Sequence, residues 1–335
     1  MSVATPASGT AFSLTAGDYV AEIASVGASL RALRYRGRDL VLPFDANDLR
    51  PAMQGAVLAP WPNRLADGVY TFDGVEHHLP LTEPATHNAS HGLVAWLDFS
   101  PVEQSEHRLV LCGRIEPQPG YPWRIRIDVT FELTVDGFRQ VVSASNESAE
   151  RAPVGLGVHP YVLAGISDNA DGSDNADGSD TADGSDTGVR RRGALNDWHL
   201  TVPAHAVLQV TEDRMLPLDV VDVAEHNAGA LDFRQRRHIG STVLNHAFTA
   251  LDADADGWAT ITVSSAEGHG VELRWDARAP WVQIYSSDAQ PTATRRQGLA
   301  IEPMTCPPDA FNSGTDLRVL PAGETTELEW RLRAL

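Results

Sequence analysis

The chain contains no lysine, because all 26 of its basic residues are arginines. Schiff-base catalysis, attachment of pyridoxal phosphate and the lysine of a Walker A phosphate loop are therefore excluded. Cysteine is also scarce: Cys112 and Cys306 are too few for a disulfide framework and lack the CxxC spacing of zinc or redox sites. We interpret both as chemically inert core or rim residues, which leaves acid-base chemistry to carboxylates, histidines and tyrosines.

Positive charge and long apolar runs are scarce as well. The 45 acidic residues outnumber the basic ones and give a net charge of −19, which disfavours binding to nucleic acid and to anionic membrane surfaces. No segment approaches the roughly 18 apolar residues of a membrane-spanning helix, and the first residues lack the basic and apolar regions of a signal peptide. We expect a soluble, cytoplasmic protein without nucleic-acid or membrane partners.

What the sequence does contain is strand periodicity from end to end. In Arg124–Leu133 apolar residues occupy alternate positions, which is typical of a strand with one buried face. The best helix candidate, Leu216 to Ala230, is interrupted by Pro217 and Gly229. The alternation returns in five further segments, which begin at Arg108, Trp258, Val271, Val282 and Thr326. The pattern predicts an all-β protein, a large antiparallel β-sandwich that forms a single domain over residues 1–335.

Two acidic segments depart from this pattern. From Ser167 the chain repeats SDNADG and SDTADG, which offers almost no apolar surface and predicts a loop insertion at about residues 167–192. The segment DADADG, Asp252 to Gly257, matches the first half of a calcium-binding EF-hand loop. Val263 occupies the twelfth position, where calcium needs a bidentate glutamate, so we predict no calcium site.

Three residues are candidates for acid-base chemistry. Glu302 lies at the end of an expected strand and is followed at once by Pro303, which indicates a carboxylate in a defined position. His91 precedes Gly92, which lets the backbone turn the ring toward a cleft. His159 stands where Pro160 ends a glycine-loosened strand. For either histidine alone, a structural role is as well supported as a chemical one.

The same residues allow more than one kind of site. A zinc site from His91, His159 and Glu302 lacks the HxxxH or HxH spacing that would support it, so no metal is predicted. Together with Arg64, these side chains suit a polyhydroxylated ligand, because sugar hydroxyls both donate and accept hydrogen bonds. Such a ligand also needs an aromatic face. The candidates for that face are Trp61, Tyr161 and Trp281.

Five sequence motifs, in this order along the chain, together resemble the aldose 1-epimerase (galactose mutarotase) family, and its bacterial branch of uncharacterised sugar mutarotases in particular. The resemblance covers nearly the full length. It implies a galactose mutarotase-like supersandwich, no metal or nucleotide cofactor, and interconversion of the α and β anomers of a free hexose. The motifs are NRLADGVYTFDG (Asn63–Gly74), HNASHGLVAW (His87–Trp96), GVHPY (Gly157–Tyr161), WVQIYSS (Trp281–Ser287) and IEPMTCPPDAFN (Ile301–Asn312) with LPAGET (Leu320–Thr325).

The resemblance also implies roles for single residues. Glu302 matches the general base of the family and His159 its general acid. We expect the imidazolium form of His159 to be favoured, because nearby acidic residues raise the pKa of a histidine. Where the family often has an aspartate that holds sugar hydroxyls, this chain has Asn245, a neutral amide that also donates. The implied substrate contacts are Arg64, His91, Asn245, Gln283 and Tyr161.

Several alternatives stay open on the sequence. A mutarotase of an anionic hexose, phosphorylated or sulfonated, would need further arginines near the pocket. A glycoside hydrolase or lyase on the same sandwich would need a second carboxylate opposite Glu302, for which only Asp232 is a candidate. A non-catalytic sugar-binding protein would keep the pocket without the chemistry. The predicted partner is in each case a small sugar, and the chain could act as a monomer or a homodimer.

Overall fold

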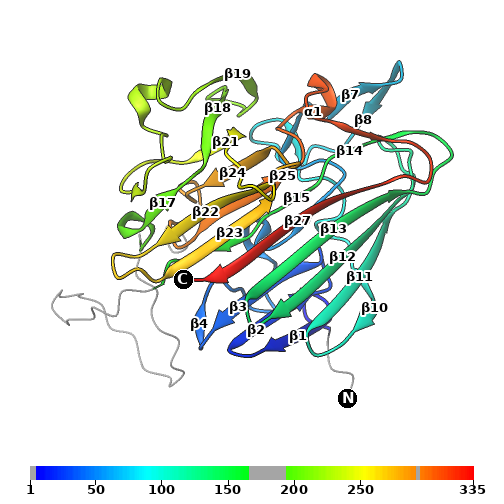
Figure 1. The fold of residues 1–335 in the computed structure, drawn as a ribbon. Helices are drawn as coiled ribbons and strands as arrows, with labels where there is room; N and C mark the ends of the chain where they lie inside the picture. Colours follow the sequence, from blue (N-terminus) through cyan, green and yellow to red (C-terminus); the bar gives the residue numbers. More distant parts are fainter. Residues whose placement is uncertain (1–4, 166–193, 292–294) are drawn as a thin grey trace, which may run out of the picture.

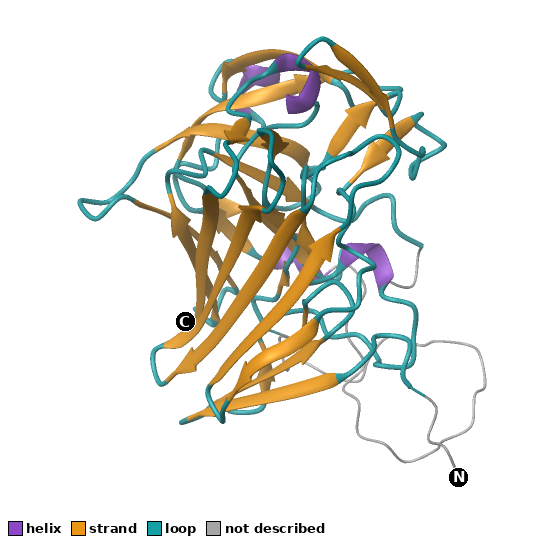
Figure 2. Cartoon of the chain, turned by 90° about the vertical axis from the view of Figure 1, so that its right-hand side faces the viewer, coloured by secondary structure: helices purple, strands orange, loops and turns teal. Residues whose placement is uncertain are grey.

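The structure is a computed structural model that describes residues 5–165, 194–291 and 295–335. The acidic repeat predicted to form a loop lies outside these residues. The described chain is built mainly from antiparallel strands, and Figure 2 shows helix only as short turns among strands and loops. The prediction of an all-β antiparallel architecture is therefore confirmed.

The larger of the two main sheets has nine strands. Figure 1 shows its long strands side by side, with the C-terminal β27 between β13 and β23 although these lie far apart in sequence. In spatial order the strands are β10 (Ser100–Gln104), β11 (Arg108–Ile115), β12 (Ile125–Thr134), β13 (Gly137–Asn146), β27 (Thr325–Ala334), β23 (Gly270–Asp276), β22 (Trp258–Ser264), β17 (His199–Thr201) and β20 (Arg237–His238).

The second main sheet has eight strands and carries part of the site described below. The short β16 (Tyr161–Val162) also pairs with its strand β25. Seven of the eight follow one another in space, and β16 is the eighth. The seven are β19 (Pro217–Asp222), β18 (Ala204–Val210), β21 (Asn245–Leu251), β24 (Trp281–Tyr285), β25 (Leu299–Met304), β15 (Gly157–Val158) and β5 (Val57–Leu58).

Smaller sheets complete the fold. The first four strands form one sheet, and three two-stranded sheets flank the main ones. Their members are β1 (Ala11–Ala16), β2 (Tyr19–Ala24), β3 (Ser29–Tyr35) and β4 (Arg38–Asp39), then β6 (Arg64–Ala66) with β9 (Asn88–Ser90), β7 (Val69–Phe72) with β8 (Val75–His78), and β14 (Ala152–Val154) with β26 (Arg318–Leu320).

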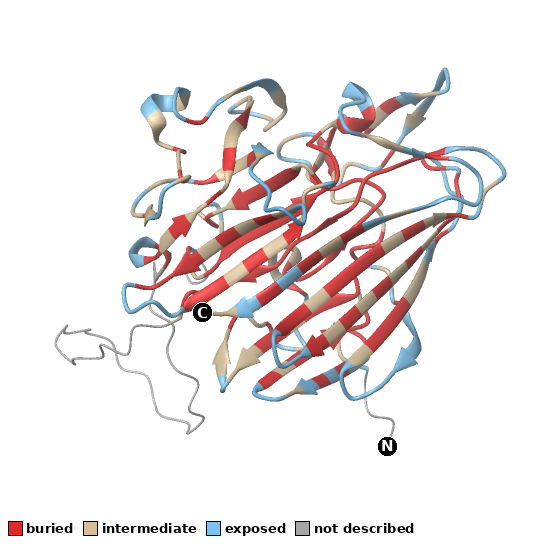
Figure 3. Cartoon of the chain, viewed as in Figure 1, coloured by how far each residue is buried: buried red, intermediate tan, exposed pale blue. Residues whose placement is uncertain are grey.

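The alternation seen in the sequence becomes the inner and outer faces of the large sheet. In β12 buried and half-buried residues alternate over nine positions, and Figure 3 shows the same alternation along its neighbours. Inward residues of both main sheets, such as Phe131 and Leu332 from one and Val282 and Ile284 from the other, belong to one apolar cluster. Because successive strand side chains point to opposite faces, one alternating pattern is enough to specify which face meets this core.

The segment that was the best helix candidate and the segment that resembles a calcium-binding loop both form strands and turns. The weak helix candidate contains β19 and a single 3-10 turn, His226–Gly229, and the one α-helix of the described residues is Ala310–Ser313. The EF-hand-like segment forms the turn between β21 and β22, where Asp254 accepts hydrogen bonds from the backbone N–H groups of Asp256 and Trp258 at 3.0 Å each. No helix of the described residues is long and apolar enough to cross a membrane.

Substitution of a large buried residue of the core should have a large effect on stability. Trp275 is fully buried, and its Nε1 donates to the carbonyl of Ala279 at 3.0 Å. We expect Trp275→Ala to lower the free energy of unfolding by about 3–5 kcal/mol, because it leaves a cavity and an unpaired carbonyl. Urea unfolding measures this change. Val135→Ala, at a 71% exposed position, is the control and should shift the value by no more than about 0.5 kcal/mol.

Candidate functional site

A cavity of about 340 Å³ opens between the eight-stranded sheet and the small β6–β9 sheet. Most of the residues that line it have polar side chains, and they come from segments that are far apart in the sequence. The residues that line it are Ala52, Met53, Asn63, Arg64, Thr82, Glu83, Ser90, His91, His159, Tyr161, Asn245, Gln283, Tyr285, Ala289, Gln290 and Glu302.

One wall of the cavity comes from adjacent strands of the eight-stranded sheet. Gln283 on β24 lies directly opposite Glu302 on β25, and Asn245 on β21 lies opposite Tyr285. The Gln283 amide Nε2 donates to Asn245 Oδ1 at 2.9 Å. This bond uses the acceptor of Asn245, so its own amide nitrogen remains as a donor. Glu302 does not end its strand as predicted, because β25 continues to Met304.

His159 reaches the same wall from the link between β15 and β16. Its backbone is fixed on both sides, since its N–H donates to Ala56 and its carbonyl accepts from Gly55. Its Nε2 lies 3.3 Å from Glu302 Oε1, and its ring stacks on Tyr161 with centroids 5.2 Å apart. His159 is only 5% exposed, so it is buried in the cavity wall instead of standing at the surface of the sandwich.

The opposite wall comes from β6, β9 and the turn after β9. The His91 N–H donates to the carbonyl of Asn63 at 2.8 Å, and its ring centroid lies 5.3 Å from that of His159. His91 and Gly92 both have positive φ angles, 63° and 75°. A Cβ on Gly92 would lie 2.1 Å from the Ala59 carbonyl oxygen, so the turn that aims His91 inward requires glycine there.

Arg64, also on this wall, is held by a partner that the sequence reasoning missed. Its Nε and a terminal nitrogen donate to the two carboxylate oxygens of Glu83 at 2.8 and 2.9 Å. Glu83 sits in the turn before β9, where its backbone bonds to Asn88 in both directions. A bidentate pair of this kind fixes the plane of the guanidinium. No spacing in the sequence pointed to Glu83.

Burial controls protonation in the cavity. Glu302 is 2% exposed, and burial raises its pKa to about 8, an effect that Arg64 partly opposes. Burial lowers the pKa of His159 to about 3 and that of His91 well below its usual value. The expectation of an imidazolium at His159 is therefore wrong, because desolvation of the ring outweighs any acidic neighbour.

Three buried polar atoms of residues that line the cavity have no hydrogen-bond partner among the described residues. They are Oε2 of Glu302, Nδ1 of His159 and Nδ1 of His91. Unpaired polar atoms are costly in a protein interior unless a ligand or water meets them. The arrangement therefore offers one carboxyl and two imidazoles to a polar ligand, within reach of each other.

All seven site residues predicted from the sequence line this one cavity: Glu302, His159, Arg64, His91, Asn245, Gln283 and Tyr161. Two other expectations differ. Trp61 packs on Phe311, with ring centroids 5.6 Å apart, and Trp281 Nε1 donates to Asp316, so neither tryptophan lines the cavity. The aromatic lining is Tyr161 together with Tyr285, which lies within the WVQIYSS motif and had not been singled out.

The remaining candidate groups lie elsewhere. Asp232 forms an ion pair with Arg234 and does not line the cavity. Cys306 is buried, and burial raises the pKa of its thiol to about 12, which keeps it unreactive. Cys112 is half-buried on β11, and burial raises its pKa as well. The prediction that both cysteines are inert core or rim residues fits these positions.

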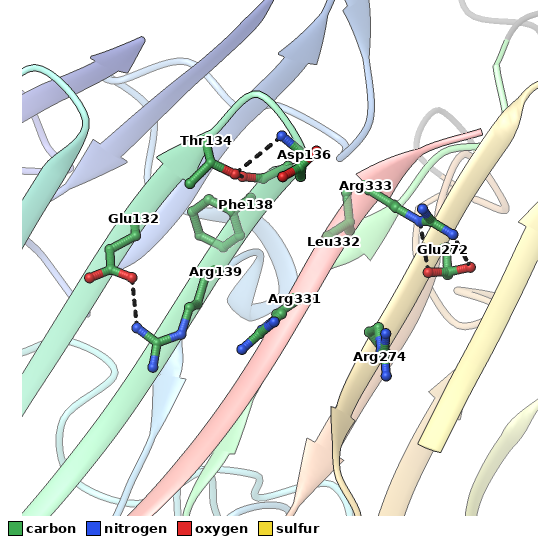
Figure 4. A pocket seen from close by; sticks show the side chains of 11 residues that line it. Glu132, Thr134, Asp136, Phe138, Arg139, Glu272, Arg274, Arg331, Leu332 and Arg333 are labelled. Carbon is green, nitrogen blue, oxygen red and sulfur yellow. Dashed lines mark hydrogen bonds and ion pairs between the residues drawn. The ribbon is translucent and has the colours of Figure 1, made fainter. Parts of the chain in front are cut away.

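A larger hollow lies on the nine-stranded sheet, away from these groups. Figure 4 shows its charged side chains standing on β12, β13, β27 and β23. Several of them form ion pairs within the hollow, as Glu132 does with Arg139 and Glu272 with Arg333. Ion pairs on an open sheet face contribute little to stability. The hollow contains no histidine and no buried carboxylate that lacks a partner among the described residues, unlike the cavity.

The sequence is similar to known proteins over most of its length. The family model described as Aldose 1-epimerase matches residues 10–173 and 193–333. The Escherichia coli K12 protein YihR is 33% identical over 322 residues, which cover 96% of this chain and 92% of YihR. Galactose mutarotase from Rattus norvegicus is 28% identical over 301 residues, which cover 83% of this chain and 77% of that enzyme.

Solved structures show the same fold. The aldose epimerase homologue from C. elegans superposes with a TM-score of 0.75 at 19% identity, over 97% of this chain and 98% of that one. Galactose 1-epimerase from Lactobacillus acidophilus gives a TM-score of 0.74 at 18% identity, over 97% and 94%. At these identities the likeness concerns the fold. The expected galactose mutarotase-like sandwich is thereby confirmed.

Proposed function

The chain belongs to the aldose 1-epimerase family, and we propose that it is a mutarotase that interconverts the α and β anomers of a free hexose in the cavity around Glu302. The observation that carries this proposal is the buried pair of Glu302 and His159, whose Oε1 and Nε2 lie 3.3 Å apart. Each of the two side chains also has a buried polar atom without a hydrogen-bond partner among the described residues. A volume of about 340 Å³ is within the usual range for small-ligand pockets.

The reaction needs one base and one acid. Glu302 takes the proton of the O1 hydroxyl while His159 gives a proton to the ring oxygen O5, so that the C1–O5 bond breaks and the open-chain aldehyde forms. Rotation about C1–C2 then presents the other face of the aldehyde, and the reverse transfers close the ring. His91 stabilises charge that develops at O5, and Arg64, Asn245 and Gln283 hold the other hydroxyls.

The pair carries the single proton that this chemistry needs. Between about pH 3 and about pH 8 that proton rests on Glu302, because burial disfavours the charged forms of both side chains. A sugar changes the balance, since an O1 hydroxyl that donates to Glu302 favours the carboxylate, and an O5 that accepts from His159 favours the imidazolium. The proton then has only the 3.3 Å between the two side chains to cross.

A hydrolase or lyase is less well supported. Such an enzyme would need a second carboxylate free to act opposite Glu302. The other carboxylate among the described cavity residues is Glu83, and both its oxygens accept hydrogen bonds from Arg64. The cavity therefore offers one acid-base pair, which suits ring opening.

Polarimetry of freshly dissolved α-glucose and α-galactose tests the proposal. We expect the purified protein to speed the approach to anomeric equilibrium in proportion to its concentration, and to leave the equilibrium itself unchanged. Heat-inactivated protein is the control. Folded protein that speeds the equilibration of no sugar would contradict the proposed enzyme and leave a sugar-binding protein in its place.

The shared proton predicts a characteristic pH dependence. The folded-state pKa of Glu302 is raised to about 8, so above that pH the pair loses its only proton and no acid is left. We expect kcat/KM to be level between about pH 5 and 7 and to fall about tenfold per pH unit above pH 8. Exchange NMR between the two anomers measures it. A rate that rises through pH 8 would instead indicate that Glu302 acts as an independent base.

A further inference from the structure

The cavity holds one pair of permanent charges, Arg64 and Glu83. Burial lowers the pKa of His91 and of His159, so neither ring is charged near neutral pH, and burial raises the pKa of Glu302 enough to keep it mostly protonated. Arg64 is thus the one cation among the described residues that line the cavity. Its charge would attract an anionic substrate if it stood alone.

Arg64 does not stand alone. Glu83 accepts from both its Nε and a terminal nitrogen, at 2.8 and 2.9 Å, and this bidentate arrangement uses two of the five N–H donors of a guanidinium. The side chains of Arg64 and Glu83 are only 16% and 30% exposed, so water screens the pair weakly. The turn around Glu83 is tied to Asn88 through the backbone, which keeps the carboxylate in place.

A phosphate or sulfonate group that approached Arg64 would also approach the carboxylate of Glu83. No lysine exists in the chain to offset the repulsion, and no other arginine lines the cavity among the described residues. Like charges at close range in a partly buried site cost far more than they do in water. A neutral hexose meets no such penalty, and its hydroxyls can use the remaining donors of Arg64.

From this geometry we infer that Glu83 is a specificity-determining residue, which makes the cavity select uncharged hexoses and reject hexoses that carry a phosphate or sulfonate group. The inference rests on the proposed mutarotase function. Glu83 would determine which sugar binds, whereas Glu302 and His159 would carry out the proton transfers of the reaction.

The test compares a neutral and an anionic sugar in wild type and Glu83→Gln. Glutamine keeps the length of the side chain and one acceptor for Arg64 but removes the charge. Exchange NMR gives kcat/KM for glucose, for glucose 6-phosphate and for 6-deoxy-6-sulfonated glucose. We expect wild type to prefer glucose by about tenfold or more, and Glu83→Gln to reduce that preference by about tenfold through a higher kcat/KM for the anions.

Two further variants serve as controls. Glu83→Asp keeps the negative charge and should keep the preference for glucose. Glu76→Gln removes an exposed carboxylate that pairs with His78 outside the cavity, so it matches the change in net charge and should alter none of the three values of kcat/KM. If Glu76→Gln shifted the preference as much as Glu83→Gln, the effect would be one of overall charge and the inference would be overturned.

The outcomes separate this inference from the proposed function. Wild type that equilibrates the anionic sugars as fast as glucose, or faster, overturns the role of Glu83 while the mutarotase stands. The same holds if Glu83→Gln leaves the preference unchanged. Wild type that equilibrates no sugar overturns the proposed function, and the inference with it.

Discussion

Glu302→Gln is expected to lower kcat for mutarotation by about a hundredfold to ten-thousandfold, the usual contribution of one positioned proton transfer. Glutamine keeps the shape of the side chain and can still hydrogen-bond the sugar, but its amide cannot take the proton of O1. Exchange NMR between the anomers measures kcat, and calorimetric titration of the sugar measures binding. We expect the affinity to change by less than about tenfold, because uniform binding is largely retained.

The stability of the same variant shows whether the lost rate reflects unfolding. The pKa of Glu302 is raised from 4.5 to about 8 in the folded chain, so the folded state holds a proton that the unfolded state releases between those values. Wild type should therefore lose stability as the pH rises from about 5 to about 8. Glu302→Gln should lose less over that interval, as measured by urea unfolding at both pH values.

Two results would count against this role of Glu302. A variant that retains wild-type kcat would show that another group takes the proton. At pH 8 burial of the ionised Glu302 carboxylate should destabilise the wild type most. A Glu302→Gln variant that is unfolded at this pH would contradict the view that burial of Glu302 costs stability.

His159→Gln has the second large expected effect, again a loss of about a hundredfold to ten-thousandfold in kcat. The substitution removes the acid that protonates O5, while the backbone bonds of residue 159 to Gly55 and Ala56 can remain. Binding of the sugar should again change far less than kcat. His78→Gln, at an exposed position outside the cavity, is the matched control and should leave kcat unchanged.

The pH dependence of this variant distinguishes a chemical role from a structural one. Without His159, Glu302 no longer has a partner with which to share its proton, and it acts as a base only when ionised. The residual rate should then rise with pH toward about 8, whereas the wild-type rate should fall above that value. A variant whose slow rate keeps the wild-type pH profile would indicate that His159 only supports the cavity wall.

Some of the site could be predicted because its signals are local. His91 beside Gly92 is an example, since a turn that needs a positive φ angle shows in the sequence as glycine. The motifs around Arg64, His159, Gln283 and Glu302 likewise marked the segments that meet in one cavity. Their assigned roles remain predictions, which the variants above test.

Other parts of the site had no local signal. Glu83 lies 19 residues from Arg64, and no pattern in either segment predicts that the two form a bidentate pair. The aromatic lining was predicted partly from tryptophans, but Trp61 and Trp281 turn toward the interior. Strand periodicity predicts that alternate residues share a face of the sheet. It does not predict which face a neighbouring loop covers.

Strand alternation and short motifs are properties of neighbouring residues, so they were enough to predict the all-β architecture and the family to which the chain belongs. The absence of lysine likewise excluded lysine chemistry. The charge state of the cavity follows instead from how the chain packs in three dimensions. His159 is neutral and Glu302 holds a proton because segments distant in sequence pack over both and exclude water. Desolvation depends on that packing, and no pattern along the chain encodes it directly.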